Sequence, residues 1–172
     1  LSRLWQWVIM ERIDKMLTPL FTVIVPTFDH GDLIQFSLRS ILRQTLQDFE
    51  IFVIGDGITA EGRECVNAFA QKDSRIHLFE FPKDSRHGEI YRHEVLTGSA
   101  HGQLVCYVGD DDLLLPDHLQ CMAECLHEHD FAHPLAIFIN TENQLGVAEG
   151  HLGLDASRRR LLAAEPFNFI SL

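Results

Sequence analysis

Short apolar runs rich in β-branched residues alternate along this chain with segments whose apolar residues recur at helical spacing. The runs begin at Phe21, Phe49, Ile76, Gln103 and Leu135 and are each five or six residues long. Such runs are typical of strands that are buried on both faces of a parallel sheet. Because segments of helical periodicity separate them, the pattern predicts repeated β–α–β units, a mostly parallel sheet and an α/β fold.

The helical segments complete this alternation. We expect helices over residues 2–17, 34–45, 60–72 and 88–100, and a last one from Pro116 to about His129, where proline suits the first helical position. The first segment is amphipathic, which predicts a packing helix at the edge of the domain. Contact with a partner or a membrane surface is the alternative.

The periodic pattern weakens after residue 140. Gly146, Gly150 and Gly153 predict turns there, and no repeat or low-complexity tract follows. The chain therefore divides into an N-terminal amphipathic helix, a main α/β domain and the incomplete start of a further region, at residues 1–18, 19–140 and 141–172.

Composition and charge exclude several classes of protein. The chain has 172 residues, 46% of them hydrophobic, which predicts a folded core and excludes general disorder. Its 14 basic residues against 25 acidic ones give a net charge of −11, which argues against a nucleic-acid binder that relies on a basic field. No apolar run approaches the roughly 20 residues of a membrane helix. Four cysteines are too few for a disulfide scaffold, so we expect a reducing, cytoplasmic setting, with peripheral membrane contact left open.

Polar residues follow three of the expected strands directly. Pro26 to Asp29 follow the first, Asp56 follows the second, and Asp110, Asp111 and Asp112 follow the strand that ends at Val108. In an open α/β sheet, ligands bind beyond the carboxyl ends of the strands. Three adjacent carboxylates repel one another unless a cation intervenes, and hard oxygen ligands suit Mg²⁺ or Mn²⁺. The alternative is an acidic loop that only caps a helix.

The ordered set of motifs resembles a family 2 glycosyltransferase of the GT-A fold over about residues 21–120. The pieces that carry the resemblance are FTVIVPTFDHG, EIFVIGDG, the Gly88, Arg92, Ala100 and Gly102 pattern, and GDDDLLLPDHL. The resemblance implies a Rossmann-like, three-layer α/β/α sandwich. It also implies metal-dependent, inverting transfer of a sugar from a nucleoside diphosphate sugar, with UDP as the expected carrier, to an acceptor hydroxyl on a saccharide, lipid-linked glycan or protein.

The same resemblance assigns roles to individual residues. Pro26, Thr27 and Phe28 would line the base pocket, and Asp56 would accept a hydrogen bond from the base. Asp111 would be the principal metal ligand, Asp110 a contact to ribose or metal, and Asp112 a further metal ligand. Arg92 would approach the donor phosphates, unless it forms a surface ion pair with Glu89 or Glu94.

The resemblance assigns no residue of this chain as the general base. The family carries an Asp or Glu in its second half, and none of the acids after residue 140 stands in a matching motif: Glu142, Glu149, Asp155 and Glu165. We therefore expect the base beyond Leu172, in a longer enzyme. A domain that binds nucleotide sugars without turnover is the alternative.

Two further clusters admit alternatives. Cys121 and Cys125 lie one helical turn apart near several histidines, which allows a metal site, but they also fit an apolar helix face packed in the core. The basic run Arg158–Arg160 fits a solvated helix face or a contact with a phosphorylated or lipid-linked acceptor.

A different enzyme on a similar sheet, such as a sugar nucleotidyltransferase, is a further alternative. That class would show a Gly-rich phosphate loop after the first strand, and the residues from Pro26 to His30 are not such a loop.

Overall fold

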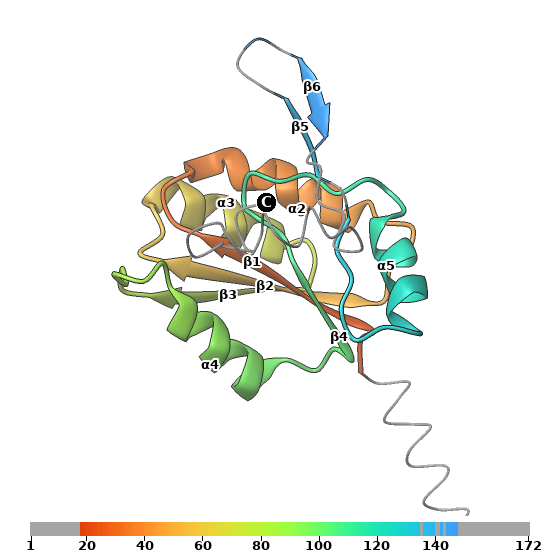
Figure 1. Cartoon of the computed structure of the whole chain (residues 1–172). Coiled ribbons are helices and arrows are strands. Elements are labelled where there is room, and N and C mark those ends of the chain that lie inside the picture. The colour runs from red at the N-terminus through yellow and green to blue at the C-terminus, as the bar shows by residue number, and fades with distance from the viewer. Residues whose placement is uncertain (1–17, 135, 140–141, 143, 148–172) are drawn as a thin grey trace, which may run out of the picture. The chain divides into compact units, whose positions relative to one another are not determined.

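The computed structural model describes residues 18–134, 136–139, 142 and 144–147 (Figure 1). The chain divides into two compact units, residues 1–123 and 124–172. The predicted N-terminal helix and the basic run Arg158–Arg160 lie outside the described residues, and the predicted domain boundaries stay predictions. Within the described residues, no helix is both long and apolar enough to cross a lipid bilayer.

The first unit is built on one parallel sheet. Its strands are β1 (Phe21–Thr27), β2 (Phe49–Asp56), β3 (Ile76–Phe81) and β4 (Leu104–Tyr107), in the order β3-β2-β1-β4. All three pairings are parallel, and Phe21 at the start of β1 aligns with Phe49 on one side and Leu104 on the other. The predicted parallel sheet is confirmed.

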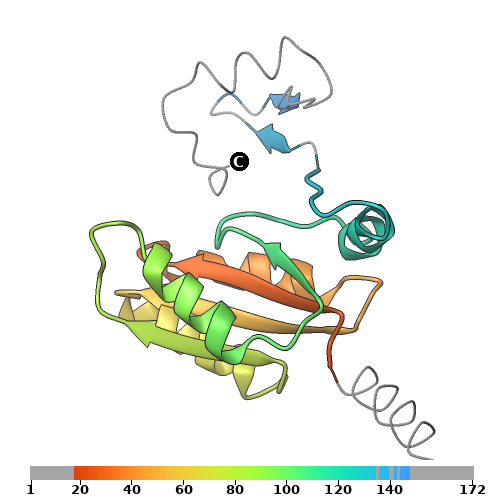
Figure 2. The same ribbon diagram turned by 60° about the horizontal axis from the view of Figure 1, so that its bottom comes forward.

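Helices cover both faces of this sheet. After the short 3₁₀ helix η1 (Gly31–Leu33), α2 (Ile34–Leu42) and α3 (Ala60–Ala70) lie on one face, and α4 (Glu89–Ser99) lies on the other (Figures 1 and 2). On the α4 side, Val95 packs in a cluster with Ile24, Phe52 and Ile54. The fold is therefore the expected three-layer α/β/α arrangement. Successive side chains of a strand point to opposite faces of the sheet, and helices cover both faces, which explains why the strand sequences are continuous apolar runs.

The helix expected from Pro116 begins and ends differently. The observed helix is α5 (His118–Leu126). It begins after Pro116 because the His118 N–H bonds to the Leu115 carbonyl at 3.0 Å, so that the residues around Pro116 form a turn. Cys121 and Cys125 are both exposed. The interpretation of these cysteines as core residues is therefore wrong.

The second unit contains a small hairpin within its described residues. β5 (Ile137–Ile139) pairs antiparallel with β6 (Leu145–Val147), so the run at 135–139 adds no strand to the parallel sheet. Gly146 lies inside β6 opposite Phe138, which corrects its prediction as a turn residue.

Candidate functional site

The predicted site segments lie at one edge of the parallel sheet. Pro26 and Thr27 are the last two residues of β1, Asp56 is the last of β2, and Asp110 comes three residues after the end of β4. Because β1 is hydrogen-bonded to both β2 and β4, these carboxyl ends are neighbours. The structure therefore gathers at one edge the three segments that the sequence separates widely.

Asp110 is held from two sides. Its Oδ1 lies 2.7 Å from Nδ1 of His30, and its side chain is only 8% exposed, against 45% for His30. The Ser37 hydroxyl donates to the Asp110 carbonyl oxygen at 2.8 Å. The hydrogen bond to Asp110, and the charge of that carboxylate, raise the pKa of His30 above its ordinary value.

A potential cation site surrounds this pair. His30, Asp110 and Asp111 each offer one ligand atom, and these atoms lie within 4.8 Å of one another. The Oδ2 atom of Asp110 is buried and has no hydrogen-bond partner among the described residues. Buried polar atoms are almost always partnered, so this oxygen is suited to coordinate a ligand. Two carboxylates and an imidazole suit Mn²⁺, and the carboxylates alone suit Mg²⁺. The residues present therefore fit a divalent cation.

Asp112 is oriented differently from its two neighbours. Its Oδ2 accepts a hydrogen bond from the Gly109 N–H at 3.2 Å, and its own N–H bonds to the Gly109 carbonyl at 3.2 Å. Its carboxylate thus closes a local turn, and its role as a metal ligand stays a prediction. His30 was not predicted as a site residue. The one signal in the sequence that could have found it is its place directly after the predicted segment from Pro26 to Asp29.

A stripe of polar side chains on and just after α2 holds the acidic segment in place. Ser40 Oγ accepts from the Leu114 N–H at 3.1 Å, and buried Gln44 donates to the Leu115 carbonyl at 2.7 Å. Gln44 also accepts from the Leu119 N–H at 2.9 Å. With Ser37 these side chains recur at helical spacing, so one face of α2 fixes the backbone that follows β4.

Asp56 is a buried carboxylate that the β3–α4 loop encloses. Its side chain pairs through Oδ2 with the Lys83 ammonium, and Oδ1 accepts from the Asp84 N–H at 2.5 Å. A Cβ on Gly88 would lie 3.0 Å from Asp56 Cβ, so glycine allows the loop to pack against this residue. The predicted base-contacting acid therefore also anchors its neighbouring loop.

Arg92 lies inside α4 and is buried, 7% exposed. Its Nη1 donates to the carbonyl of His87 at 2.8 Å. Among the described residues Arg92 forms no ion pair with Glu89 or Glu94. The alternative role for Arg92, a surface ion pair with one of these acids, is therefore wrong. His87 itself has a positive φ of 56°, which is costly for a residue with a side chain, and the Arg92 bond helps to fix it.

The end of β1 offers an unpartnered polar atom and an aromatic face. Thr27 Oγ1 is buried without a hydrogen-bond partner, and it shares this property with Asp110 Oδ2 alone among the described side chains. Phe28 follows and is 39% exposed. The Lys83 ammonium lies 4.2 Å from the centre of its ring. Both unpartnered oxygens thus belong to residues that the sequence predicted for the site.

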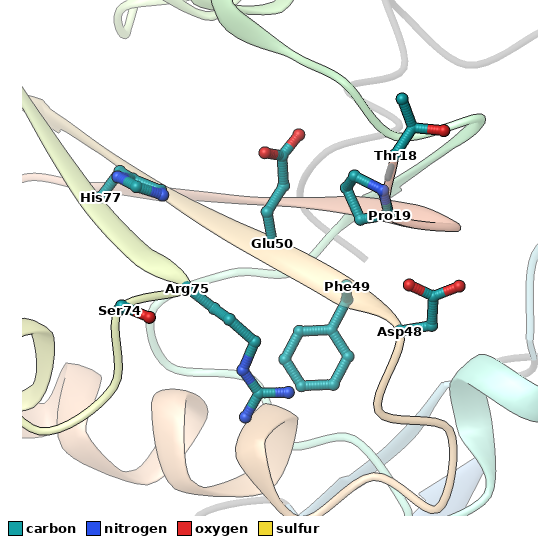
Figure 3. Close-up of a pocket in the computed structure, with 8 residues that line it drawn as sticks. All are labelled: Thr18, Pro19, Asp48, Phe49, Glu50, Ser74, Arg75 and His77. Carbon is teal, nitrogen blue, oxygen red and sulfur yellow. The ribbon is translucent and has the colours of Figure 1, made fainter. Parts of the chain in front are cut away.

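A separate open depression lies at the opposite edge of the sheet (Figure 3). Its walls come from the residues before or at the starts of β1, β2 and β3, and the Arg75 guanidinium lies over the Phe49 ring at 4.3 Å. It is lined by Thr18, Pro19, Asp48, Phe49, Glu50, Ser74, Arg75 and His77. No residue of the predicted site lines this depression.

Comparison with known proteins matches most of this chain to one family. Residues 22–162 match the family model described as glycosyl transferase family 2. Glycosyltransferase GlyG of Streptococcus pneumoniae is 25% identical over 114 residues, which cover 66% of this chain and 37% of that protein. The GalNAc(5)-diNAcBac-PP-undecaprenol beta-1,3-glucosyltransferase of Campylobacter jejuni is 29% identical over 143 residues, 83% of this chain and 44% of that one. The chain thus spans less than half the length of these relatives.

Solved structures resemble the fold. The crystal structure of S. aureus TarS 1-349 in complex with UDP matches with a TM-score of 0.55 and 26% identity, over 64% of this chain and 32% of that one. A further crystal structure of S. aureus TarS matches with a TM-score of 0.58 and 24% identity, over 78% of this chain and 24% of that one.

Proposed function

The chain belongs to glycosyl transferase family 2, and from that premise we propose that its carboxyl sheet edge binds a nucleoside diphosphate sugar for transfer to an acceptor hydroxyl. One observation carries the proposal. Thr27 Oγ1 at the end of β1 and Asp110 Oδ2, three residues after the neighbouring β4, are buried without partners. Since buried polar atoms are almost always hydrogen-bonded, a bound ligand and ion would supply the missing partners.

The donor's base would occupy the ends of β1 and β2. Pro26, Thr27 and Phe28 would line its pocket, with the exposed Phe28 ring as a stacking surface. Asp56 would accept an N–H of the base, which suits the imide N–H of uracil. The match to a UDP-bound TarS structure supports a UDP-type donor.

The diphosphate would lie toward the end of β4. Asp110 and Asp111, with His30, would hold Mg²⁺ or Mn²⁺. Asp112 would be a further ligand. The cation, when bound, would offset the negative charge that develops on the departing diphosphate. Arg92 would add a fixed positive charge near the phosphates. The net charge of −11 is therefore compatible with a diphosphate ligand, because the bound cation and Arg92 would supply positive charge locally and no basic field is needed.

The transfer itself requires groups beyond those of the donor site. We propose a single displacement with inversion, in which the acceptor hydroxyl loses its proton to a general base. We place that base outside the described residues, in the acceptor side of a longer enzyme. The setting we propose is cytoplasmic. The acceptor class stays open among saccharide, lipid-linked glycan and protein, and peripheral membrane contact stays open as well.

Titration with UDP tests the donor site. We expect UDP to bind at least about tenfold more tightly with Mn²⁺ than with a chelator, because the cation bridges carboxylates and diphosphate. Asp111→Asn should abolish this difference, and Asp117→Asn, an exposed acid outside the proposed ligand group, should keep it. Release of UDP from UDP-sugars, measured separately, distinguishes an enzyme from a module that only binds.

Two results would count against the proposal. Metal-independent UDP binding would remove the cation from the site. Binding that survives Asp111→Asn unchanged would show that the carboxyl edge of β4 does not contact the diphosphate.

A further inference from the structure

Four large apolar side chains of the first unit are exposed: Leu33, Phe36, Leu113 and Leu115. Their exposed fractions run from 48% to 67%. Leu33, whose backbone is already helical, and Phe36 are three residues apart and share one face of α2. The two others come from the segment between β4 and α5. None of the four belongs to the proposed ligand group, and together we call them the apolar patch.

Hydrogen bonds hold the segment before α5 alongside α2. The Leu114 N–H bonds to Ser40 Oγ at 3.1 Å, and the Leu115 carbonyl accepts from the Gln44 amide at 2.7 Å. Phe36 lies one turn before Ser40 on the same face of α2. The segment therefore runs along α2, as Figure 1 shows, and its two exposed leucines flank the residue that bonds to this face.

Charged residues border the apolar patch with opposite signs on its two sides. On the α2 side, Arg39 and Arg43 are exposed, and among the described residues neither forms an ion pair with an acid. α2 itself carries no acid, and η1 before it contributes Asp32. On the other side, Asp112 and Asp117 are exposed in and just after the segment that carries the leucines. The surface is thus basic on one side and acidic on the other.

This charge pattern suits a second copy of the chain better than a lipid surface. A surface that binds anionic lipid carries basic residues around its apolar centre, whereas Asp112 and Asp117 would turn negative charge toward the headgroups. In a two-fold arrangement whose axis runs parallel to α2, between the two sides, the basic side of each copy meets the acidic side of the other. The apolar patches then meet at the centre.

We propose that the apolar patch is the interface of a symmetric homodimer, in which Arg43 of each copy pairs with Asp117 of the other. These residues lie at the same level along α2, because Gln44 bonds to the Leu115 carbonyl and the Leu119 N–H on either side of Asp117. The inference goes beyond the proposed function and does not depend on donor binding. Since two chains of charge −11 repel one another, association depends on the apolar centre and on these local pairs.

Sedimentation equilibrium of the chain in buffer of physiological salt tests the dimer. At this ionic strength the Debye length is about 8 Å, so charges far from the interface are largely screened. Phe36→Ser removes an apolar contact from the centre of the patch. Ile90→Ser is its matched control, because Ile90 is also 50% exposed and lies on α4, on the other face of the sheet.

Charge reversal tests the pair itself. Arg43→Glu and Asp117→Arg each place like charges opposite one another, and the double variant restores opposite charges with their places exchanged. We expect the wild type to dimerise, and we expect Phe36→Ser and each single reversal to weaken the association at least about tenfold. The double reversal should recover most of the lost affinity, and Ile90→Ser should match the wild type. If a single reversal does not fold by circular dichroism, the comparison of Phe36→Ser with Ile90→Ser decides.

Three results would overturn the inference. A wild-type chain that stays monomeric at all concentrations has no such interface. A double reversal that associates no better than the single variants would show that Arg43 and Asp117 do not face one another. A monomer that sediments with phosphatidylcholine–phosphatidylglycerol vesicles, and loses this in Phe36→Ser, would assign the apolar patch to a lipid surface. UDP binding, measured separately, tests the proposed function alone, so either proposal can fail while the other stands.

Discussion

Nδ1 of His30 lies 2.7 Å from Oδ1 of Asp110, across 80 positions of sequence, and this contact joins the loop after β1 to the acidic segment after β4. The bond leaves Oδ2 of Asp110 as the buried oxygen without a partner. His30 therefore orients the carboxylate that the proposed cation would meet, and it also offers a nitrogen of its own.

Removing His30 should weaken the metal-dependent part of UDP binding. We expect His30→Ala to lower the apparent Mn²⁺ affinity, measured in the presence of UDP, by about tenfold, as for the loss of a group that orients or completes a ligand set. His129→Ala, an exposed histidine in the second unit, should leave it unchanged. Equal Mn²⁺ affinity in His30→Ala and wild type would show that the His30–Asp110 contact is only structural.

Gln44 should matter for the stability of the fold. Its side-chain amide bonds to the carbonyls of Ser40 and Leu115 and to the N–H of Leu119, and it is 2% exposed. Gln44→Met keeps the volume and leaves the Leu119 N–H and the Leu115 carbonyl without these partners, which should cost about 2–3 kcal/mol in urea unfolding. Gln35→Met, on the half-buried start of α2, is the control and should cost less than about 0.5 kcal/mol. A loss as small as the control's would mean that other groups hold the acidic segment.

Much of this architecture was predictable because local pattern and topology agree. The apolar runs at Phe21 and Phe49 become adjacent parallel strands, and the rule that ligands bind beyond strand ends places Asp56 and Asp110 at one edge. Those features depend on residues close in sequence or on a general property of α/β sheets.

What escaped prediction depends on contacts between distant segments. Neither the His30–Asp110 bond nor the Lys83–Asp56 pair leaves a periodic signal, because each joins loops that the sheet brings together. The exposed cysteines of α5 show the same limit: their spacing fitted an apolar face, yet Leu119 is the helix's buried residue. The hairpin of β5 and β6 likewise follows from a pairing that no single run of residues specifies.

Gly102 should tolerate no side chain. A Cβ there would lie 2.2 Å from the backbone nitrogen of Thr22, and the Gly102 N–H bonds to the Thr22 hydroxyl at 2.9 Å. Gly102→Ala should therefore separate the starts of β1 and β4 and cost at least about 2 kcal/mol. Gly98→Ala is the matched control, because nothing lies within 4 Å of its Cβ position inside α4. It should stabilise the chain by about 0.5–1 kcal/mol. Urea unfolding of both variants measures the contrast, and equal effects would refute the close approach.

The Asp73–Arg75 pair should give a pH-dependent contribution to stability. Arg75 donates to both carboxylate oxygens of Asp73, at 2.9 and 2.7 Å, and these bonds lower the pKa of Asp73 in the folded state. A lowered folded pKa means that the contribution is present above the unfolded value, near 4, and is lost as the pH falls through the folded pKa. Asp73→Asn should thus cost about 1 kcal/mol at pH 7, with the difference from wild type shrinking below about pH 4. Urea unfolding at pH 7 and pH 3 measures the difference, with Asp48→Asn, an exposed acid near the same sheet edge, as the control. A difference for Asp73→Asn that stays constant from pH 7 to pH 3 would mean that the Asp73 carboxylate charge contributes nothing to the folded state.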